Sequence, residues 1–507
     1  MKPHRICLFS AFLIISLMHC ITAGAAETIL PASDTASQSA VVAPLQKFAG
    51  LVIEGNRSLL AAGHDLESAM FEKNRALESF SPHFYYSSDA SKSANRDYNS
   101  LTGIEEDYTT RRKGSGAGIS QRTPIGNISY DYVDNKTEYT TSQTSYFKSL
   151  YLSVKTGLLR NDARLNSLER RLAHAEYEIN QAQTDSLLLD VLLNAFQTLF
   201  NRIVAARNQA LKKQNLNFYA SLVEEAEIKL KNGIGSELDL KQASMRFQQA
   251  ETGNEETGLA LHDNDRQLAT QLGRSEWNPE IASFSLESLL SCIPSAISIT
   301  EFEKTALNRR PDYRVYLSQY KMQRAAFERA RELSRPNLAA TARWGKQGRG
   351  FTEEAADAMA DKSWDVAITY SMSLGPEPES LSFSSQREKL KAFEAKLEQK
   401  RDDIKIAVAE SAERIEFCRR NLASLKASEK LSVEVLEGQR LNFQLGKVSL
   451  LDLTRYQQEY DNASLAVVQG ETRLIMEWLR LLYVTGTLAE FAKAGTGNEI
   501  RKSACNK

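Results

Sequence analysis

The sequence predicts a mainly α-helical protein with a smaller β part, built from two tandem structural repeats. Proline is absent between Pro124 and Pro279 and again after Pro378, so each tract can hold very long uninterrupted helices. Segments in which apolar and polar residues alternate occur ahead of the long helical tracts, and this alternation is typical of strands. One eight-residue pattern occurs in each half of the chain, which indicates a repeated unit.

The overall composition excludes several classes of protein. Lys and Arg number 63 against 64 Asp and Glu, whereas a nucleic-acid binder usually shows a basic excess. The chain is 42% hydrophobic and 25% charged, which fits neither a helical membrane protein nor a disordered one. Cysteines and histidines are scattered without a CxxC or HExxH pattern. We therefore expect no nucleic-acid partner, no metal, no cofactor and no enzymatic activity.

Residues 1–25 have the three regions of a secretory signal peptide. Lys2 and Arg5 are basic, an apolar run follows from Ile6 to Met18, and small residues end the segment at Ala23-Gly24-Ala25. The apolar run is too short to span a bilayer comfortably.

Lipid attachment at Cys20 is an alternative reading of the same segment. His19 stands where a lipoprotein signal normally has Gly or Ala, which favours ordinary cleavage instead. Residues 26–45 then form an N-terminal extension ahead of the first repeat.

The repeated pattern is G-x-x-S-x-L-D-L, found at residues 233–240 and 446–453. The same offset links Gly273 to Gly486, so both copies have the same distance from their first glycine to a closing glycine. Chance rarely keeps such a register. The expected parts are a first repeat (46–273), an inter-repeat equatorial segment (274–305), a second repeat (306–486) and a C-terminal tail (487–507).

Each repeat is expected to open with a helix and to continue, beyond its strands, into a much longer one. The opening helices run from about 57 to 80 and from 311 to 333, where Pro311 suits a first helical turn. The long helices run from about 160 to 231 and from about 386 to 445. At about 1.5 Å per residue they reach on the order of 100 Å, and antiparallel packing would bury their apolar stripes.

Four strands are expected, two in each repeat. The clearest is 364–372, where large apolar residues alternate with small or polar ones, and the others are 82–87, 149–154 and 338–344. Tilted strands of about nine or ten residues can cross a bilayer, although a soluble half-buried sheet shows the same alternation. The secretion signal favours an outer-membrane barrel. Because an open four-stranded sheet could not hide its edges in lipid, copies of the chain must share that barrel.

The repeated pattern lies where each long helix must reverse. Gly233 and Gly446 can adopt the left-handed conformation that ends a helix. Ser236 and Ser449 can cap the helix that follows. The pattern therefore predicts two helical hairpin tips.

Capping also accounts for the acidic residues of the tips, but less well for the leucines. Asp239 and Asp452 complete an S-x-x-D box and favour the positive end of the helix. Leu238 and Leu451 are large apolar residues at an exposed turn, which indicates a docking surface.

Taken together, these features resemble the TolC-like family of outer-membrane efflux proteins. The resemblance covers about residues 46 to 488, and besides the tips and the order of elements it rests on the segment 306–312 and on the pattern Ala325, Ala326, Ala330 and Pro336. It implies a homotrimer in the bacterial outer membrane with a periplasmic extension. Each copy would give four strands to a twelve-stranded β-barrel that continues into a long periplasmic α-helical barrel.

The resemblance also implies a function. The protein would be the exit duct of a tripartite efflux or type I secretion system, with a periplasmic adaptor docked at the tips and an inner-membrane transporter behind it. Asp452 and Asp239 match the acids that narrow the entrance. Arg455, Phe443 and Val448 depart from the family pattern, so no specific latch is carried over. A non-conducting trimeric coiled-coil envelope scaffold is the alternative function.

The first repeat contains an extra stretch at about residues 96–139, which is rich in Gly and Thr. Ile128, Tyr130 and Tyr132, close to Pro124-Ile125-Gly126, suggest an added hairpin. By the topology of the family, this stretch would join the first two strands and lie outside the cell.

Overall fold

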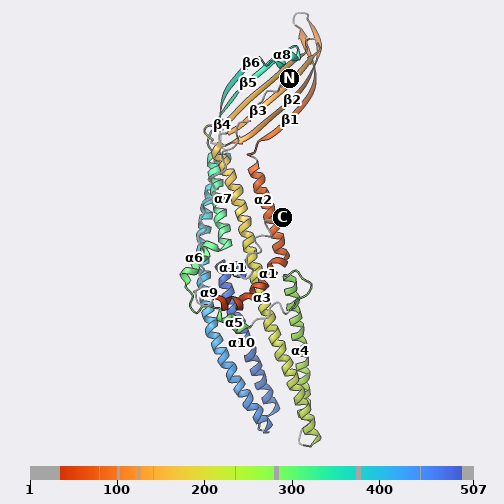
Figure 1. The fold of residues 1–507 in the computed structure, drawn as a ribbon, viewed down its shortest axis with the longest axis vertical. Coiled ribbons are helices and arrows are strands. Elements are labelled where there is room, and N and C mark those ends of the chain that lie inside the picture. The colour runs from red at the N-terminus through yellow and green to blue at the C-terminus, as the bar shows by residue number, and fades with distance from the viewer. Residues whose placement is uncertain are drawn as a thin grey trace, which may run out of the picture.

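The computed structural model shows an elongated molecule with a β-sheet at one end and two helical hairpins at the other (Figure 1). The expected signal peptide at 1–25, with Cys20 within it, and Gly446 at the second tip lie outside the described residues. The structure describes residues 35–78, 80–99, 103–123, 126–140, 142–160, 162–233, 236–278, 285–372, 378–445 and 447–493.

The described sheet has six strands, so the expectation of four strands per copy is wrong. All neighbours are antiparallel, and the order across the sheet follows the order along the chain. The strands are β1 (His83–Asn99), β2 (Ile104–Thr123), β3 (Gly126–Tyr139), β4 (Ser145–Gly157), β5 (Asn337–Gly350) and β6 (Asp361–Ser371).

The extra stretch at 96–139 supplies the two additional strands, β2 and β3. The expected hairpin exists, because Thr123 pairs with Gly126 at its turn. The expectation that this stretch lies outside the cell stays a prediction, but one of its turns contacts a helix, because the Asn166 side chain of the first long helix donates to the Thr123 carbonyl oxygen at 3.0 Å. The turn therefore lies at the helical end of the sheet, and both strands run the length of the sheet.

Small residues on β2 hid this strand from pattern analysis. Gly114, Gly116 and Gly118 fall on alternate positions, so the expected row of large side chains is missing. A Cβ at Gly118 would lie 2.7 Å from the Tyr85 ring and 2.7 Å from an Asp131 oxygen, so the side chains of the neighbouring strands fill the space over this residue. The side chains that cover this part of β2 come from its neighbours.

Four helices lie side by side below the sheet in the order α2 (Arg57–Glu78), α3 (Asp162–Lys231), α7 (Pro311–Leu333) and α9 (Pro378–Gln444) (Figure 1). By length and composition alone, α3 is apolar enough to cross a membrane. Its most apolar part instead forms the protein core, where Leu192 and Leu199 are fully buried and Leu189 is nearly so. The apolar character of α3 is thus explained by packing.

The return helices α4 (Glu237–Gln271) and α10 (Leu450–Val484) each contain 35 residues. The glycine that follows each one has a left-handed backbone, with φ of 64° at Gly273 and 74° at Gly486. Both hairpins, α3–α4 and α9–α10, end at the same pole of the molecule (Figure 1).

Short helices surround the middle of the shaft and join the two chain ends to its core. Leu45 of α1 (Thr35–Gly55) and Leu488 of α11 (Leu488–Lys493) are fully buried in one hydrophobic cluster with Phe196 of α3. The described end of the expected extension, through Leu45, and the described start of the expected tail, through Leu488, therefore both contribute to the core. The remaining short helices are α5 (Leu286–Ser291), α6 (Ile299–Arg309) and α8 (Glu353–Asp357), of which α8 packs on β4 and β5.

Candidate functional site: a two-faced sheet and two hairpin tips

One face of the sheet carries an unbroken apolar row. Directly paired residues on antiparallel strands lie on the same face, so the strand register defines the row. From β1 to β6 it reads Phe84, Ile119, Tyr130, Leu152, Trp344 and Trp364. These side chains are between 40% and 74% exposed, although each is large and apolar. Exposed apolar surface of this extent marks a site of contact with lipid or protein.

The opposite face is polar. The neighbouring row reads Tyr85, Gly118, Asp131, Tyr151, Gly345 and Ser363. Tyr85 donates a hydrogen bond to Asp131, and Tyr151 donates one to Gln347 Oε1 at 2.8 Å. A sheet with one apolar and one polar face, alternating residue by residue, is the pattern of a barrel wall between lipid and water.

A charged cluster marks the outer limit of the apolar face. Lys148 lies on the same face as Leu152, four residues away on β4, and its side chain is only 6% exposed. Its Nζ lies 2.6 Å from Asp357 and 3.3 Å from Glu353, both on α8, and 3.5 Å from Asp134. The helix α8 thus packs on the apolar face of the sheet, where its acidic side chains neutralise the buried Lys148.

The first hairpin tip has the local structure that the sequence predicts. Gly233 has φ of 73°, and the Ser236 Oγ accepts a hydrogen bond from the Leu238 backbone N–H at 3.1 Å. Leu238 is 62% exposed, and the exposed Asp239 lies in the first turn of α4. The tip is therefore a capped turn that presents an apolar side chain to solvent.

The second tip is capped by a more complete hydrogen-bond pair. The Ser449 Oγ accepts from the Asp452 backbone N–H at 3.2 Å and donates to Asp452 Oδ2 at 2.6 Å. Leu451 is 61% exposed, while Asp452 is half-buried. Asp452 therefore stabilises its own helix start, whatever further role its charge has.

A buried polar seam joins the second hairpin to α3, and sequence analysis missed it. Asp461 on α10 accepts hydrogen bonds from Asn215 Nδ2 on α3 and from Gln457 Nε2, the latter at 3.0 Å. Arg440 on α9 donates to Gln457 Oε1 at 2.8 Å. The signal was present, because Thr454, Gln457, Asp461 and Ser464 recur at core spacing along α10 and all are at most 9% exposed.

The environment of Asp461 disfavours its charged form. Burial raises the pKa of its carboxyl above the ordinary value, while the hydrogen bonds from Asn215 and Gln457 and the charges of Lys212 and Arg440 oppose the shift. A buried carboxylate needs such partners, since a charge transferred out of water without them is costly. The seam is therefore a specific contact between α3 and α10.

Two cation–π contacts extend this link toward the tips. Arg440 lies 5.6 Å from the centre of the Phe218 ring on α3, and Lys229 Nζ lies 5.0 Å from the centre of the Phe443 ring on α9. Phe443, which departs from the family pattern, thus still joins the two hairpins. Arg455, the second departure, pairs with Glu459 on its own helix at 3.6 Å.

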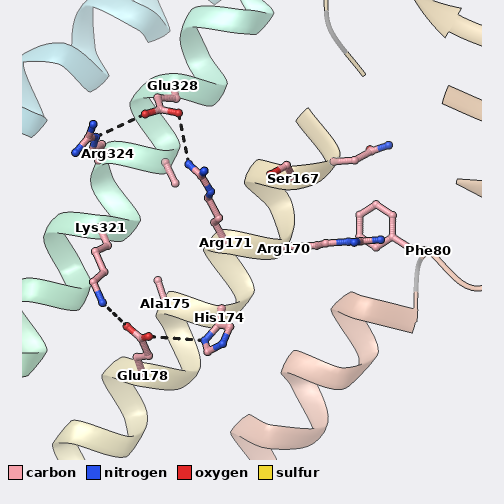
Figure 2. Close-up of a pocket in the computed structure, with 12 residues that line it drawn as sticks. Phe80, Ser167, Arg170, Arg171, His174, Ala175, Glu178, Lys321, Arg324 and Glu328 are labelled. Atoms are coloured by element: carbon pink, nitrogen blue, oxygen red, sulfur yellow. Dashed lines mark hydrogen bonds and ion pairs between the residues drawn. The ribbon is translucent and has the colours of Figure 1, made fainter. Parts of the chain in front are cut away.

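A cavity of about 710 Å³ lies between α3, α7 and Phe80, just below the sheet (Figure 2). Its charged lining is largely paired, because Glu178 binds Lys321 at 3.1 Å and Glu328 lies 3.6 Å from Arg324 and 3.8 Å from Arg171. These pairs connect α3 to α7. Among the residues that the structure describes, no group of three or more His, Cys, Asp or Glu side chains is placed to hold a metal ion.

Comparison with solved structures identifies the fold class as that of bacterial outer-membrane channels. No family model matches the chain, and no curated protein matches it. The Campylobacter jejuni CmeC outer membrane channel aligns at a TM-score of 0.66 and 16% identity, covering 90% of this chain and 91% of that one. CusC, described in connection with transmembrane channel formation, gives 0.67 and 16%, covering 87% and 92%. The outer membrane protein VceC from Vibrio cholerae gives 0.63 and 14%, covering 87% and 96%.

Proposed function

We propose that this protein is a TolC-like outer-membrane channel, a homotrimer that serves as the exit duct of a tripartite efflux or type I secretion system. One observation carries the proposal: an apolar row crosses all six described strands on one face, with a polar row behind it, at the end of a long helical shaft. Lipid would cover the apolar face, and water and cargo would pass along the polar one. The fold it shares with outer-membrane channels supports this reading.

Assembly with further copies is supported by apolar stripes on both flanks of the shaft. The α9 stripe consists of exposed residues spaced close to whole numbers of helical turns, so they lie on one face. They are Leu381, Ile406, Phe417, Leu431 and Val435. The other flank exposes Leu60 and Phe71 on α2 and Met245 and Leu259 on α4. In a closed ring, the α9 flank of one copy packs on the α2–α4 flank of the next.

The tips are the proposed docking surface for the periplasmic adaptor, with the inner-membrane transporter behind it. Leu238 and Leu451 are both more than 60% exposed, and the outer helix α4 offers further apolar surface. Three copies of Asp452, with Asp239 beside them, would form an acidic constriction that favours cations.

Single-channel conductance in planar bilayers tests the proposal. The purified protein should conduct and favour cations, and Asp452→Asn should reduce that selectivity because it removes one charge per copy from the constriction. Glu256→Gln, on the exposed surface of α4, is the matched control and should leave selectivity unchanged. A trimer that does not conduct would favour the envelope scaffold instead.

A further inference from the structure

The additional hairpin makes the sheet about as wide as the layer of helices below it. Four helices lie side by side in each copy, and at about 9 Å between axes they span an arc of about 36 Å. Six strands spaced about 4.8 Å apart and tilted by about 40° span about 38 Å of a barrel circumference. Four strands would span only about 25 Å on the same measure. The six-stranded sheet therefore matches the arc of the helices beneath it.

The two edges of the sheet are suited to each other. Because β1 to β6 alternate in direction and are even in number, β6 runs antiparallel to the β1 of a neighbouring copy. In lipid, both edges would carry unpaired backbone N–H and C=O groups unless a strand of another copy covered them. The edge strands also carry the most exposed apolar side chains, such as Phe84 at 72% and Trp364 at 74%, against Leu152 at 40% on an inner strand.

The polar face of the sheet leaves room in the lumen. Gly114, Gly116 and Gly118 place no side chain on this face of β2. The Tyr85 ring crosses the space over Gly118 to reach Asp131 on β3, so it lies along the wall. Barrels of sixteen to eighteen strands enclose an aqueous channel, whereas eight strands leave an interior that side chains fill.

From these observations we propose that β1 of each copy pairs with β6 of the next, and that three copies close a barrel of eighteen strands. The lumen at the membrane is then as wide as the helical tunnel below it, with no narrowing where sheet and helices meet. The inference rests on the proposed homotrimeric channel. It departs from the twelve strands that the family resemblance implied, because the hairpin β2–β3 adds two strands to every copy.

Cysteine crosslinking of the full-length protein in membranes tests the strand contact. Ser87→Cys on the polar face of β1 is combined in turn with Asp365→Cys, Ala367→Cys and Thr369→Cys on the same face of β6, in a background without Cys292, Cys418 and Cys505. A parallel pair, Phe71→Cys on α2 with Leu381→Cys on α9, reports the helical flanks. Both pairs should give a crosslinked ladder that ends at three copies.

The two crosslinks separate the inference from the proposed function. Flank crosslinks without any β1–β6 crosslink would overturn the barrel and leave the trimeric channel standing. The absence of both would overturn the two together. A ladder that ends at another copy number would overturn the eighteen strands.

Excision of the hairpin provides an independent measurement of width. Deleting residues 104–139 joins β1 to β4, which run antiparallel and can pair in the same way. The circumference of the barrel should fall to two-thirds. The largest poly(ethylene glycol) that enters from the extracellular side should therefore have a radius at least about one-third smaller than for the full chain, because the side-chain layer inside the barrel keeps its thickness. Equal cut-offs for a folded variant and the full chain would contradict the proposal, and the crosslinks decide the matter if the variant does not fold.

Discussion

The two hairpins share a tip pattern and return helices of equal length, yet they are packed very differently. Within α4, the first return helix, the buried residues are Ala243, Leu268 and Ala269, all but one of them at its far end. The second return helix, α10, is buried along its whole length, from Leu453 near the tip to Val484. A shared local motif therefore fixes the turn and not the surroundings of the helix that follows it.

Because of this difference, the first hairpin leaves an exposed apolar surface, whereas the second is fixed to the rest of the shaft. The α4 helix keeps an apolar outer face that a partner or another copy can cover, with Met245 and Leu259 about half exposed or more. The α10 helix is held against α3 through Asp461 and its partners. Four substitution experiments follow from the comparison, in order of decreasing effect.

The largest contrast is expected from truncating one leucine on each return helix. Leu479 of α10 is fully buried in the core cluster, and Leu479→Ala should lower the free energy of unfolding by about 3 kcal/mol because it leaves a cavity. Leu259 of α4 is 60% exposed within one copy, so Leu259→Ala should lower the free energy of unfolding by less than Leu479→Ala, and only by what contact with the next copy contributes. Denaturant unfolding of the detergent-solubilised protein measures both. Equal losses would show that α4 is as buried as α10 in the assembled protein.

The polar seam should give the next largest effect. Asp461→Ala removes the acceptor of Asn215 Nδ2 and one of the two acceptors of Gln457 Nε2, at a cost of about 1 to 3 kcal/mol. Loosening of α10 from α3 should also increase single-channel conductance. Asp263→Ala on the exposed side of α4 is the control and should change neither quantity. A conductance identical to the original protein would show that the seam does not restrain the tips.

The same carboxyl predicts a pH dependence of stability. Because burial raises the pKa of Asp461 in the folded protein, the folded state holds this proton more tightly than the unfolded state. The stabilisation is complete below the unfolded pKa and is lost as the pH rises through the folded one. Asp461→Asn should remove this contribution. As the pH falls from about 7 to about 4, the melting temperature of the original protein should therefore rise relative to that of the variant. A constant difference would contradict the assignment.

The caps should show the smallest effect and a difference between the tips. Ser449→Ala loses two hydrogen bonds and should cost about 1 kcal/mol, whereas Ser236→Ala loses one and should cost about half as much. Hydrogen exchange of the first turns of α10 and α4 measures the local opening. Equal changes at the two tips would indicate that the Asp452 side chain adds nothing to the cap.

Much of the helical shaft could be predicted because its signals are local. The expected helix at 311–333 is confirmed by α7 with the same ends, since Pro311 fixes its first turn. The left-handed conformation of Gly233 and the capping by Ser236 and Ser449 are also confirmed, because these signals too are local. The roles of Asp452 and Asp239 in a constriction and of the tip leucines in docking stay predictions, because they depend on other chains.

The sequence by itself determined the long helices, their reversals and the capped tips, because each depends on hydrogen bonds within a few residues. The tertiary structure alone decided that the hairpin of β2 and β3 is inserted into the main sheet between β1 and β4, and that Asp461 meets Asn215. A strand whose alternate residues are glycines has no side-chain pattern of its own, and its partners supply both its hydrogen bonds and its cover. The role of a polar residue at core spacing, such as Asp461, likewise depends on which residue faces it, and that residue is distant in the sequence.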